Sequence, residues 1–263
     1  MDLQLKDKRA LVTGASRGLG YATARRLAYE GAWVAINSRN AEILAETSLQ
    51  LAKECHTEVI ALPGDVTDPA VPEALIQQAA RAFDGLDILI TNAGGPPPGR
   101  FDGFDDSAWQ KAIELSLMSH VRLIRAALPW LRKSSSASVL AVTSYSVKQP
   151  IPNLVLSNSV RAATVGLIKT LALELGSEGI RFNSILPAWT ETERVYALME
   201  ARARTNGTTV ADEMVKQARD SALGRMGTPE EFANAAVFLV SPAAAYITGV
   251  MLTVDGGMYK GTL

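Results

Sequence analysis

Thr13-Gly14-Ala15-Ser16-Arg17-Gly18-Leu19-Gly20 follows a short apolar run, residues 10–12, and precedes a helical pattern, residues 21–29. This order predicts a strand, a glycine turn and a helix. Glycines lack a Cβ, so they adopt positive φ values and let a flat ligand approach the backbone. The free N–H groups at the start of the helix favour an anion such as a pyrophosphate. The spacing G-x-x-x-G-x-G differs from the commoner G-x-G-x-x-G, so a purely structural turn remains the alternative.

The composition excludes several classes of protein. The 263 residues carry a formal net charge of −1, and 48% of them are apolar. This length and apolar content suffice for a sizeable core, and the charge favours neither a nucleic-acid nor a membrane partner. Cys55 is the single cysteine, which excludes an intrachain disulfide and a cysteine metal cluster. We expect no metal site, and we interpret His56 and His120 as structural or exposed residues.

The sequence also indicates where the protein is located. Residues 1–7 contain no apolar signal region. No apolar run reaches the length of a membrane-spanning helix. We therefore expect a cytoplasmic protein.

Apolar strand-like runs alternate with helical patterns along the chain. We expect strands at residues 9–12, 32–36, 59–62, 86–90, 138–142, 181–186 and 250–254. Because these runs are apolar throughout, they predict a parallel sheet covered by helices on both faces, with ligands at the carboxyl ends of the strands. The sequence contains no internal repeat or linker, so we predict one domain over residues 1–263.

The helices between the strands have recognisable starts and faces. Asp68 is expected to cap a helix that ends at Phe83, and Ser107 to cap a long helix that reaches about Leu131. Residues 115–128 and 160–175 are apolar on more than one face, which predicts burial on two sides. One side can meet the sheet. A partner subunit or other helices of the same chain would cover the second side, and we favour a homodimer or homotetramer.

Four motifs in series resemble one family, the short-chain dehydrogenase/reductases, and within it the 3-oxoacyl-carrier-protein-reductase-like members. They are the glycine turn, Asn92-Ala93-Gly94, the Ser144 segment and Val254-Asp255-Gly256-Gly257. The resemblance covers essentially the whole chain. It implies a Rossmann-type doubly wound sheet of about seven parallel strands with helices on both faces, a nicotinamide dinucleotide site and usually a tetramer.

The resemblance also implies which residues bind the cofactor. The glycine turn would bind the pyrophosphate, the residues after the third strand would flank the adenine, and the others would line the nicotinamide half. These residues are Gly14, Ser16, Arg17, Gly18, Leu19, Gly20, Arg39, Asp65, Val66, Asn92, Ala93, Gly94, Arg161, Pro187 and Thr192. The family's usual glycine after that proline is Ala188 here.

The end of the second strand favours NADP over NAD. An NAD site places a carboxylate there, to accept hydrogen bonds from the ribose hydroxyls. This strand is followed by Asn37-Ser38-Arg39, without an acid. Arg39 and Arg17 lie where a 2′-phosphate would be, and a guanidinium binds phosphate in a bidentate way. The alternative is two solvated surface arginines.

The catalytic positions depart from the family pattern, which uses a serine, a Tyr-x-x-x-Lys pair and an asparagine on an earlier helix. Ser144 occupies the serine position, and Ser157, thirteen residues later, falls at the tyrosine. Arg161 falls at the lysine and Ser116 at the asparagine. A serine hydroxyl is a far weaker acid than a tyrosine, whose pKa near 10 a cation can lower. Arg161 keeps its charge and cannot join a proton relay.

Three interpretations follow. The first is an NADP-dependent oxidoreductase for a small carbonyl or alcohol substrate, with an atypical or weakened proton-transfer site in which Tyr145 or Lys148 replaces the lost donor. The second is a nucleotide-binding pseudoenzyme that acts as a sensor or a silent partner subunit. The third is a different reaction in the same cleft. We favour the first, with residues 189–222 as the substrate lid.

Overall fold

Seven strands form one sheet in the order β3-β2-β1-β4-β5-β6-β7 in the computed structural model, which describes residues 1–262. They are β1 (Arg9–Val12), β2 (Trp33–Ser38), β3 (Val59–Pro63), β4 (Ile88–Thr91), β5 (Ser138–Val142), β6 (Arg181–Pro187) and β7 (Met251–Val254). Every neighbouring pair is parallel. Each expected strand is present with bounds that differ by at most two residues. The expected domain extends to residue 263, which lies outside the described residues.

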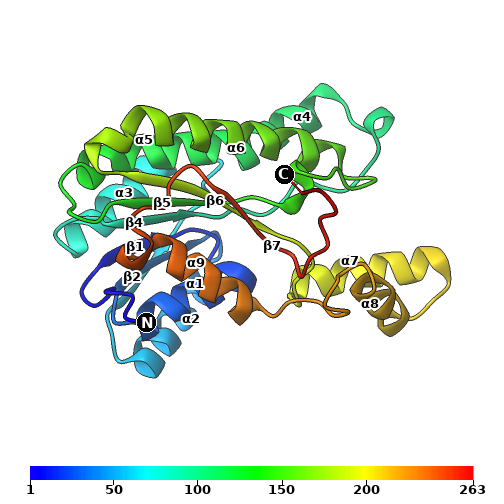
Figure 1. Cartoon of the computed structure of the whole chain (residues 1–263), viewed down its shortest axis with the longest axis horizontal. Coiled ribbons are helices and arrows are strands. Elements are labelled where there is room, and N and C mark those ends of the chain that lie inside the picture. Colours follow the sequence, from blue (N-terminus) through cyan, green and yellow to red (C-terminus); the bar gives the residue numbers. More distant parts are fainter. Residues whose placement is uncertain (263) are drawn as a thin grey trace.

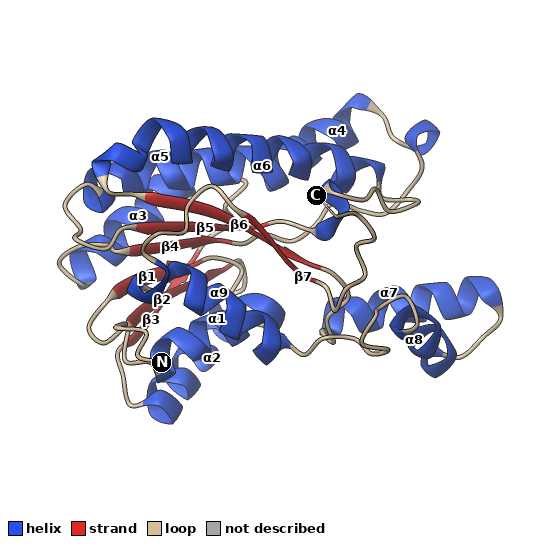
Figure 2. Cartoon of the chain, viewed as in Figure 1, coloured by secondary structure: helices blue, strands red, loops and turns tan. Residues whose placement is uncertain are grey.

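Helices cover both faces of this sheet, as Figures 1 and 2 show. One layer consists of α1 (Gly18–Tyr29), α2 (Ala41–Cys55) and α9 (Pro229–Val240), and the other of α3 (Val71–Ala82), α4 (Asp106–Ile113), α5 (Ser119–Leu131) and α6 (Val155–Leu175). Successive strand residues point to opposite faces, so Ala10 and Val12 pack with the α1 layer. Leu11 packs with the α3 layer. The predicted doubly wound α/β domain is confirmed.

Two predicted helix caps were wrong. The N-cap of α3 is Ala70, because an extra turn precedes the helix and Asp68 accepts the N–H of Ala70 at 3.0 Å within that turn. The N-cap of α4 is Asp105, whose carboxylate accepts the N–H of Ala108 at 2.9 Å, and Ser107 lies inside the helix. In both places several residues able to cap a helix follow one another, and the sequence does not distinguish among them.

The long helix predicted to end near Leu131 consists of three segments. A π-helical turn, Glu114–Met118, separates α4 from α5. A π-helical turn frees a backbone carbonyl from the regular bonding pattern. Here the hydroxyl of Thr164 on α6 donates to the carbonyl of Ser116. This bond fixes the widened turn against α6.

Helices α7 (Glu193–Asn206) and α8 (Val210–Ala218) stand apart from the two layers, beyond the carboxyl ends of β6 and β7 (Figure 1). Their connection is fixed by Glu213, which is buried and accepts hydrogen bonds from the Asn206 amide at 2.9 Å and the Thr208 hydroxyl at 2.8 Å. A separate apolar cluster that includes Trp189 and Met199 joins this pair to the rest of the chain. Among residues 1–262, no helix has the length and apolar composition to cross a membrane.

Candidate active site

The glycine turn has the backbone geometry of an anion-binding loop. Gly14 and Gly18 have φ values of 61° and 59°, which side chains disfavour. A Cβ at Gly20 would overlap the carbonyl oxygen of Gly14. The N-cap of α1, Arg17, makes no side-chain capping bond, and the first turn of α1 contains no acid. The N–H groups at this helix start are therefore available to a pyrophosphate, and the residues present fit a dinucleotide.

Asn92 holds the glycine turn in place. Its backbone N–H donates to the hydroxyl of Thr13 at 2.9 Å, and that hydroxyl donates to the Asn92 carbonyl at 2.8 Å. Its side-chain amide donates to the carbonyl of Gly14 at 3.2 Å. Asn92 follows β4 and Thr13 follows β1, and these strands are neighbours in the sheet. The sequence predicted Asn92 as a residue that lines the cofactor. The structure adds that it anchors the turn.

The end of β2 is free of carboxylates. Asn37 is buried there, and its amide donates to the carbonyls of Leu62 at 2.8 Å and Gly64 at 3.1 Å. Arg39, two residues later, is exposed. Asn37 thus joins β2 to the loop after β3, and Arg39 provides an exposed cation directly after β2.

Two further predicted residues shape the loops around the turn. Asp65 accepts the N–H of Thr67 at 3.0 Å and its hydroxyl at 2.8 Å, which rigidifies the loop after β3, where Val66 is buried. Thr192 is the N-cap of α7 and lies against Gly18, with its Cγ2 3.6 Å from where a Cβ at Gly18 would be. Thr192 therefore lies beside the glycine turn at the start of α7, and Asp65 fixes the loop that follows β3.

The Arg17 side chain has an acidic partner. Its guanidinium forms an ion pair with Glu193, the first residue of α7, at 2.9 Å. Both side chains are largely exposed. The pair links the glycine turn to the start of the predicted lid.

Arg161 is buried and attached to the backbone. Its Nη1 donates to the carbonyls of Val142 at 3.3 Å and Thr143 at 2.9 Å, and its Nη2 donates to the carbonyl of Gly94 at 3.2 Å. The side chain therefore joins α6 to the loops that follow β5 and β4. Burial, together with the nearby charge of Arg194, lowers the pKa of Arg161 to about 10. It remains a cation at neutral pH, and no acid within residues 1–262 forms an ion pair with it.

The three serines differ in their surroundings. Ser144 follows β5 by two residues and accepts the N–H of Ser146 at 3.1 Å. Ser157, half-buried, lies in the first turn of α6, one turn before Arg161. Ser116 lies in the π-helical turn, is 2% exposed, and its hydroxyl has no hydrogen-bond partner in the described chain. Ser144, Ser157 and Arg161 thus come from the carboxyl end of β5 and the start of α6.

Tyr145 contacts the apolar cluster at the start of residues 189–222, and Lys148 contacts the C-terminal segment. Tyr145 is buried in the cluster that contains Trp189, and burial raises its pKa although a hydrogen bond with Trp189 opposes the rise. The ammonium of Lys148 lies 5.2 Å from the centre of the Tyr259 ring. No hydrogen bond in the described part of the chain links either residue to Ser144 or Arg161.

Two further residues, His120 and Arg194, lie near this site. His120 is buried one helical turn after Ser116, and its Nδ1 lies 2.7 Å from the Thr91 hydroxyl. Desolvation, reinforced by the charge of Arg161, lowers its pKa to about 3, so it is neutral at pH 7. Arg194, on α7, donates to the carbonyl of Gly95 at 3.5 Å. Gly95 is distant from Arg194 in the sequence, so no pattern near Arg194 predicts this contact.

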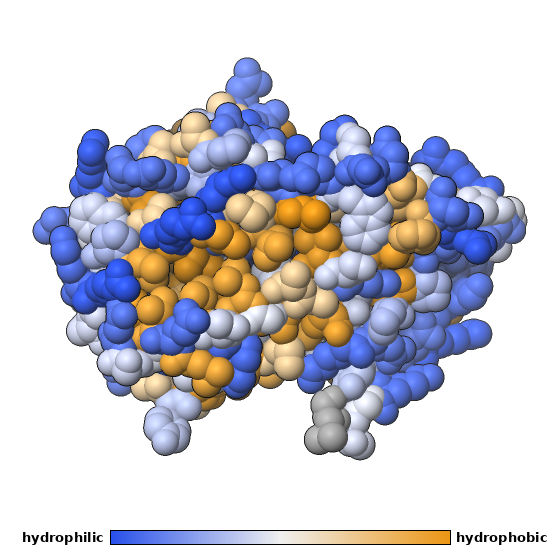
Figure 3. Space-filling model, turned by 90° about the horizontal axis from the view of Figure 1, so that it is seen from above, coloured by the Kyte–Doolittle hydropathy of each residue, from blue (hydrophilic) through white to orange (hydrophobic). Residues whose placement is uncertain are grey.

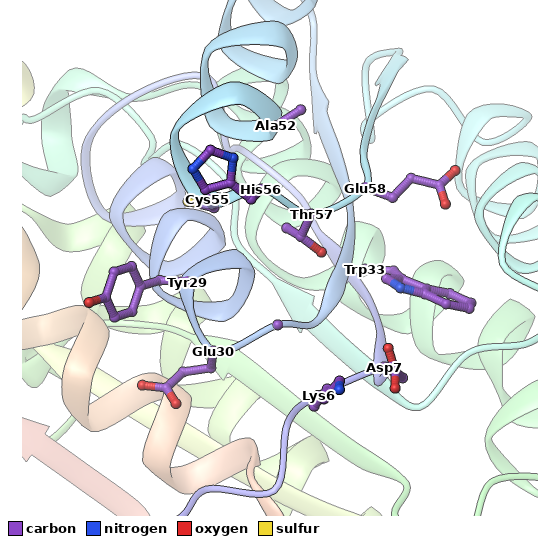
Figure 4. A pocket seen from close by; sticks show the side chains of 11 residues that line it. Lys6, Asp7, Tyr29, Glu30, Trp33, Ala52, Cys55, His56, Thr57 and Glu58 are labelled. Atoms are coloured by element: carbon purple, nitrogen blue, oxygen red, sulfur yellow. The ribbon is translucent and has the colours of Figure 1, made fainter.

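A surface hollow of about 620 Å³ lies elsewhere, at the amino ends of the first three strands (Figure 4). Lys6, Asp7, Glu30, His56 and Glu58 contribute side chains of both charges to it. It is remote from the glycine turn, which follows the carboxyl end of β1. The hollow is therefore separate from the candidate active site.

The comparisons with known proteins agree with this geometry. A family profile described as enoyl-(acyl carrier protein) reductase matches residues 14–259. The 3-oxoacyl-[acyl-carrier-protein] reductase of Vibrio cholerae is 35% identical over 260 residues, which cover 98% of this chain and 99% of that protein.

The chain belongs to the short-chain dehydrogenase/reductase family.

Two solved structures show how far this short-chain dehydrogenase/reductase resembles others. L-sorbose reductase from Gluconobacter frateurii, complexed with NADPH and L-sorbose, matches with a TM-score of 0.95 and 32% identity over 99% of this chain and 100% of that chain. The NADPH-bound short-chain oxidoreductase from Pseudomonas aeruginosa PAO1, described as containing an atypical catalytic centre, matches with a TM-score of 0.89 and 32% identity over 98% and 100%. The Rossmann-type arrangement predicted from the motifs is thereby confirmed.

Proposed function

We propose that this protein is an NADP-dependent oxidoreductase for a small carbonyl or alcohol substrate, with a weakened proton-transfer site. The observation that carries the proposal is the glycine turn, where Gly20 packs on the Gly14 carbonyl beneath the uncapped start of α1. This arrangement retains everything that the backbone contributes to pyrophosphate binding. The similar L-sorbose reductase was solved with NADPH and a sugar substrate, which supports the assignment.

The preference for NADP is supported by charge at the adenosine end. β2 ends without a carboxylate, and Arg39 is exposed beside it. Arg17, the N-cap of α1, is the second arginine expected here, and its exposed guanidinium is paired with Glu193. An additional phosphate would gain two guanidinium partners there, whereas an unphosphorylated ribose would find no acid.

The altered positions still support part of the reaction. A bound nicotinamide dinucleotide would supply the hydride acceptor or donor. Ser144 and Ser157 provide hydroxyl donors for a substrate oxygen, and Arg161 provides a fixed positive charge that stabilises a developing alkoxide. Neither a serine hydroxyl nor the Arg161 guanidinium is a good proton donor at neutral pH, so the proton would come from Tyr145, Lys148 or solvent. The protein could still orient the cofactor and the substrate, and this orientation contributes to the rate independently of proton transfer.

A nucleotide-binding pseudoenzyme is the second candidate, and one observation favours it. The Arg161 guanidinium is already bonded to three backbone carbonyls, as a structural arginine would be. A protein of this kind would bind NADPH tightly and turn over no carbonyl compound.

We also propose that residues 189–222 form the substrate lid. Trp189 and Met199 are buried in an apolar cluster that lies beyond the carboxyl ends of the strands. Arg202 stacks on the Trp189 ring with its Cζ 4.8 Å from the ring centre, and its Nη1 donates to Gln217 on α8. These contacts make α7 and α8 one packed unit that can close over a small molecule.

The protein is proposed to form a homodimer or homotetramer through α5 and α6. Figure 3 shows a broad apolar area on the face that these helices present, surrounded by polar residues. On α6, Ala162, Ala163, Gly166 and Leu173 are exposed along the side turned away from the sheet. An apolar area of this kind on a soluble domain is typical of a protein interface.

The cofactor assignment is tested by calorimetric titration of nucleotide-free protein with NADPH and NADH. NADPH should bind more tightly than NADH, and Arg39→Ala should weaken NADPH about tenfold without changing NADH. Arg25→Ala is the matched control, because Arg25 lies on α1 and pairs with Glu54. Binding of neither nucleotide would refute both candidate functions.

The two candidates are then separated by turnover. NADPH oxidation by the purified protein across a panel of ketones, aldehydes and sugars should be measurable above the rate without protein. If NADPH binds tightly and no compound is reduced, the pseudoenzyme is the correct function.

A further inference from the structure

Two guanidinium groups meet at consecutive peptide carbonyls in the loop after β4. Arg161 donates to the carbonyl of Gly94 at 3.2 Å, and Arg194 donates to the carbonyl of Gly95 at 3.5 Å. They come from different elements, α6 and α7, so only the folded chain brings them together. A Cβ at Gly95 would lie 2.5 Å from Nη2 of Arg194, so the glycine leaves the room that the arginine occupies.

This pair carries positive charge without an acidic partner. Within residues 1–262, neither guanidinium forms an ion pair with a carboxylate. Burial lowers the pKa of both arginines, and the charge of Arg194 lowers that of Arg161 further. Two like charges in a partly desolvated site repel each other, and an anion placed between them removes this cost.

Two other arginines of the proposed lid have partners within the lid itself. Arg204 pairs with Glu200 one turn away on α7, and Arg202 is held by Gln217 and the Trp189 ring. Arg194 is accessible to solvent, but it turns toward Gly95. It is therefore a lid arginine without an acidic partner in the described chain, and it lies beside the loop after β4.

The position of the pair indicates which ligand it serves. The pyrophosphate site lies at the glycine turn, which Asn92 contacts directly. Gly94 and Gly95 continue the same loop away from that turn and toward α7. Arg194 approaches this loop from the proposed lid. The site between the two arginines thus lies on the substrate side of the cleft.

We propose that Arg194, supported by the positive field of Arg161, binds the carboxylate of an anionic carbonyl substrate, an oxo acid. The inference rests on the proposed function, because it names the substrate class of that same cleft. Arg161 uses three of its five N–H donors on the backbone, so it retains donors for a ligand. A charge-assisted bidentate bond to Arg194 selects a carboxylate over a neutral ester of the same shape.

The test uses full-length protein saturated with NADP⁺, which forms a complex that cannot reduce the ketone. Benzoylformate and acetoacetate are titrated by calorimetry, with ethyl benzoylformate and methyl acetoacetate as neutral counterparts. At least one acid should bind about tenfold to a hundredfold more tightly than its ester. Arg194→Met should abolish this difference and Arg194→Lys should retain most of it. Arg204→Met, which removes a charge from the same helix, should leave it unchanged.

Each other outcome has a definite meaning. If NADP⁺ binds normally and both acids bind no more tightly than their esters, the substrate class is wrong while the proposed function stands. If Arg194→Met weakens NADP⁺ itself, the anion served by the pair is a phosphate of the cofactor, and the inference is overturned. If NADP⁺ does not bind to the unaltered protein, the proposed function fails first.

Discussion

At Arg161, which the sequence motifs align with the lysine of the family pattern, the chain has a planar guanidinium with five N–H donors. Two of its nitrogens bond three backbone carbonyls, which fixes the loops after β4 and β5 on α6. A lysine has its three N–H donors on one nitrogen, whereas the two Nη atoms of Arg161 reach carbonyls of different loops. Arg161 thus has a structural role in addition to its charge, and we propose that it takes no part in proton transfer.

Restoring the usual pair should restore proton transfer. We expect Ser157→Tyr with Arg161→Lys to raise the rate of carbonyl reduction by about 10²–10⁴-fold, the usual contribution of general acid catalysis. The measurement is NADPH oxidation with the best substrate of the panel, as a function of pH. Ser159→Tyr with Arg161→Lys is the control, because Ser159 is exposed on the same helix. An equal gain in the control would show that the position of Ser157 is not the cause.

His120 should make the protein sensitive to acid. Its pKa is about 3 in the folded chain and near 6.5 in the unfolded chain, so the unfolded state binds more protons between these values. Stability therefore falls as the pH drops through this window, by about 1.4 kcal/mol per unit. Urea unfolding of the unaltered protein at pH 6.5 and 4.5 should reveal about 2 kcal/mol of loss from this group. The His120→Asn variant should lose that part of the pH dependence. If its free energy of unfolding changes between the two pH values as much as that of the unaltered protein, His120 is not the cause.

At the scale of elements, the bond between α6 and the π-helical turn positions Ser116. Thr164→Val removes the hydroxyl that donates to the carbonyl of the buried Ser116. We expect a loss of about 1–3 kcal/mol in the free energy of unfolding. Chemical denaturation measures it, with Thr170→Val as control. Thr170 is exposed on α6, and its hydroxyl bonds only within the helix, to Gly166. Equal losses in the two variants would mean that the link to the turn contributes nothing.

The helices and strands could be predicted because the residues that define and end them are close together in the sequence. Gly31 and Gly176 end helices, and the apolar strands have turn residues on both sides, so their bounds were close to the observed ones. The π-helical turn could not be predicted, because the Thr164 hydroxyl that stabilises it is distant in the chain. The functional site shows the same contrast between local signals and contacts of residues that are distant in the chain. The glycine turn is visible in the sequence, whereas the meeting of Arg161 and Arg194 at Gly94 and Gly95 depends on the packing of α6 and α7.

At the scale of the whole molecule, the apolar face of α5 and α6 should control assembly. Leu173 on α6 is 75% exposed, and Leu49 on α2 is 73% exposed. We expect Leu173→Glu to shift the protein toward the monomer, because a charge at an apolar interface is costly to bury. Leu49→Glu should leave assembly unchanged. Light scattering after size-exclusion chromatography measures the mass, and an unaltered protein that is already monomeric would refute the oligomer.

The ion pair between Arg17 and Glu193 connects the two ends of the proposed reaction site. A guanidinium that turns to a phosphate at the adenosine end must give up some of its contact with the carboxylate at the start of α7. Loading of a phosphorylated cofactor would then free the first turn of the lid before any substrate arrives. The expected kinetic consequence is an ordered sequence in which the nucleotide binds first and substrate affinity depends on which nucleotide is bound. High salt, which screens exposed charges, should weaken this dependence.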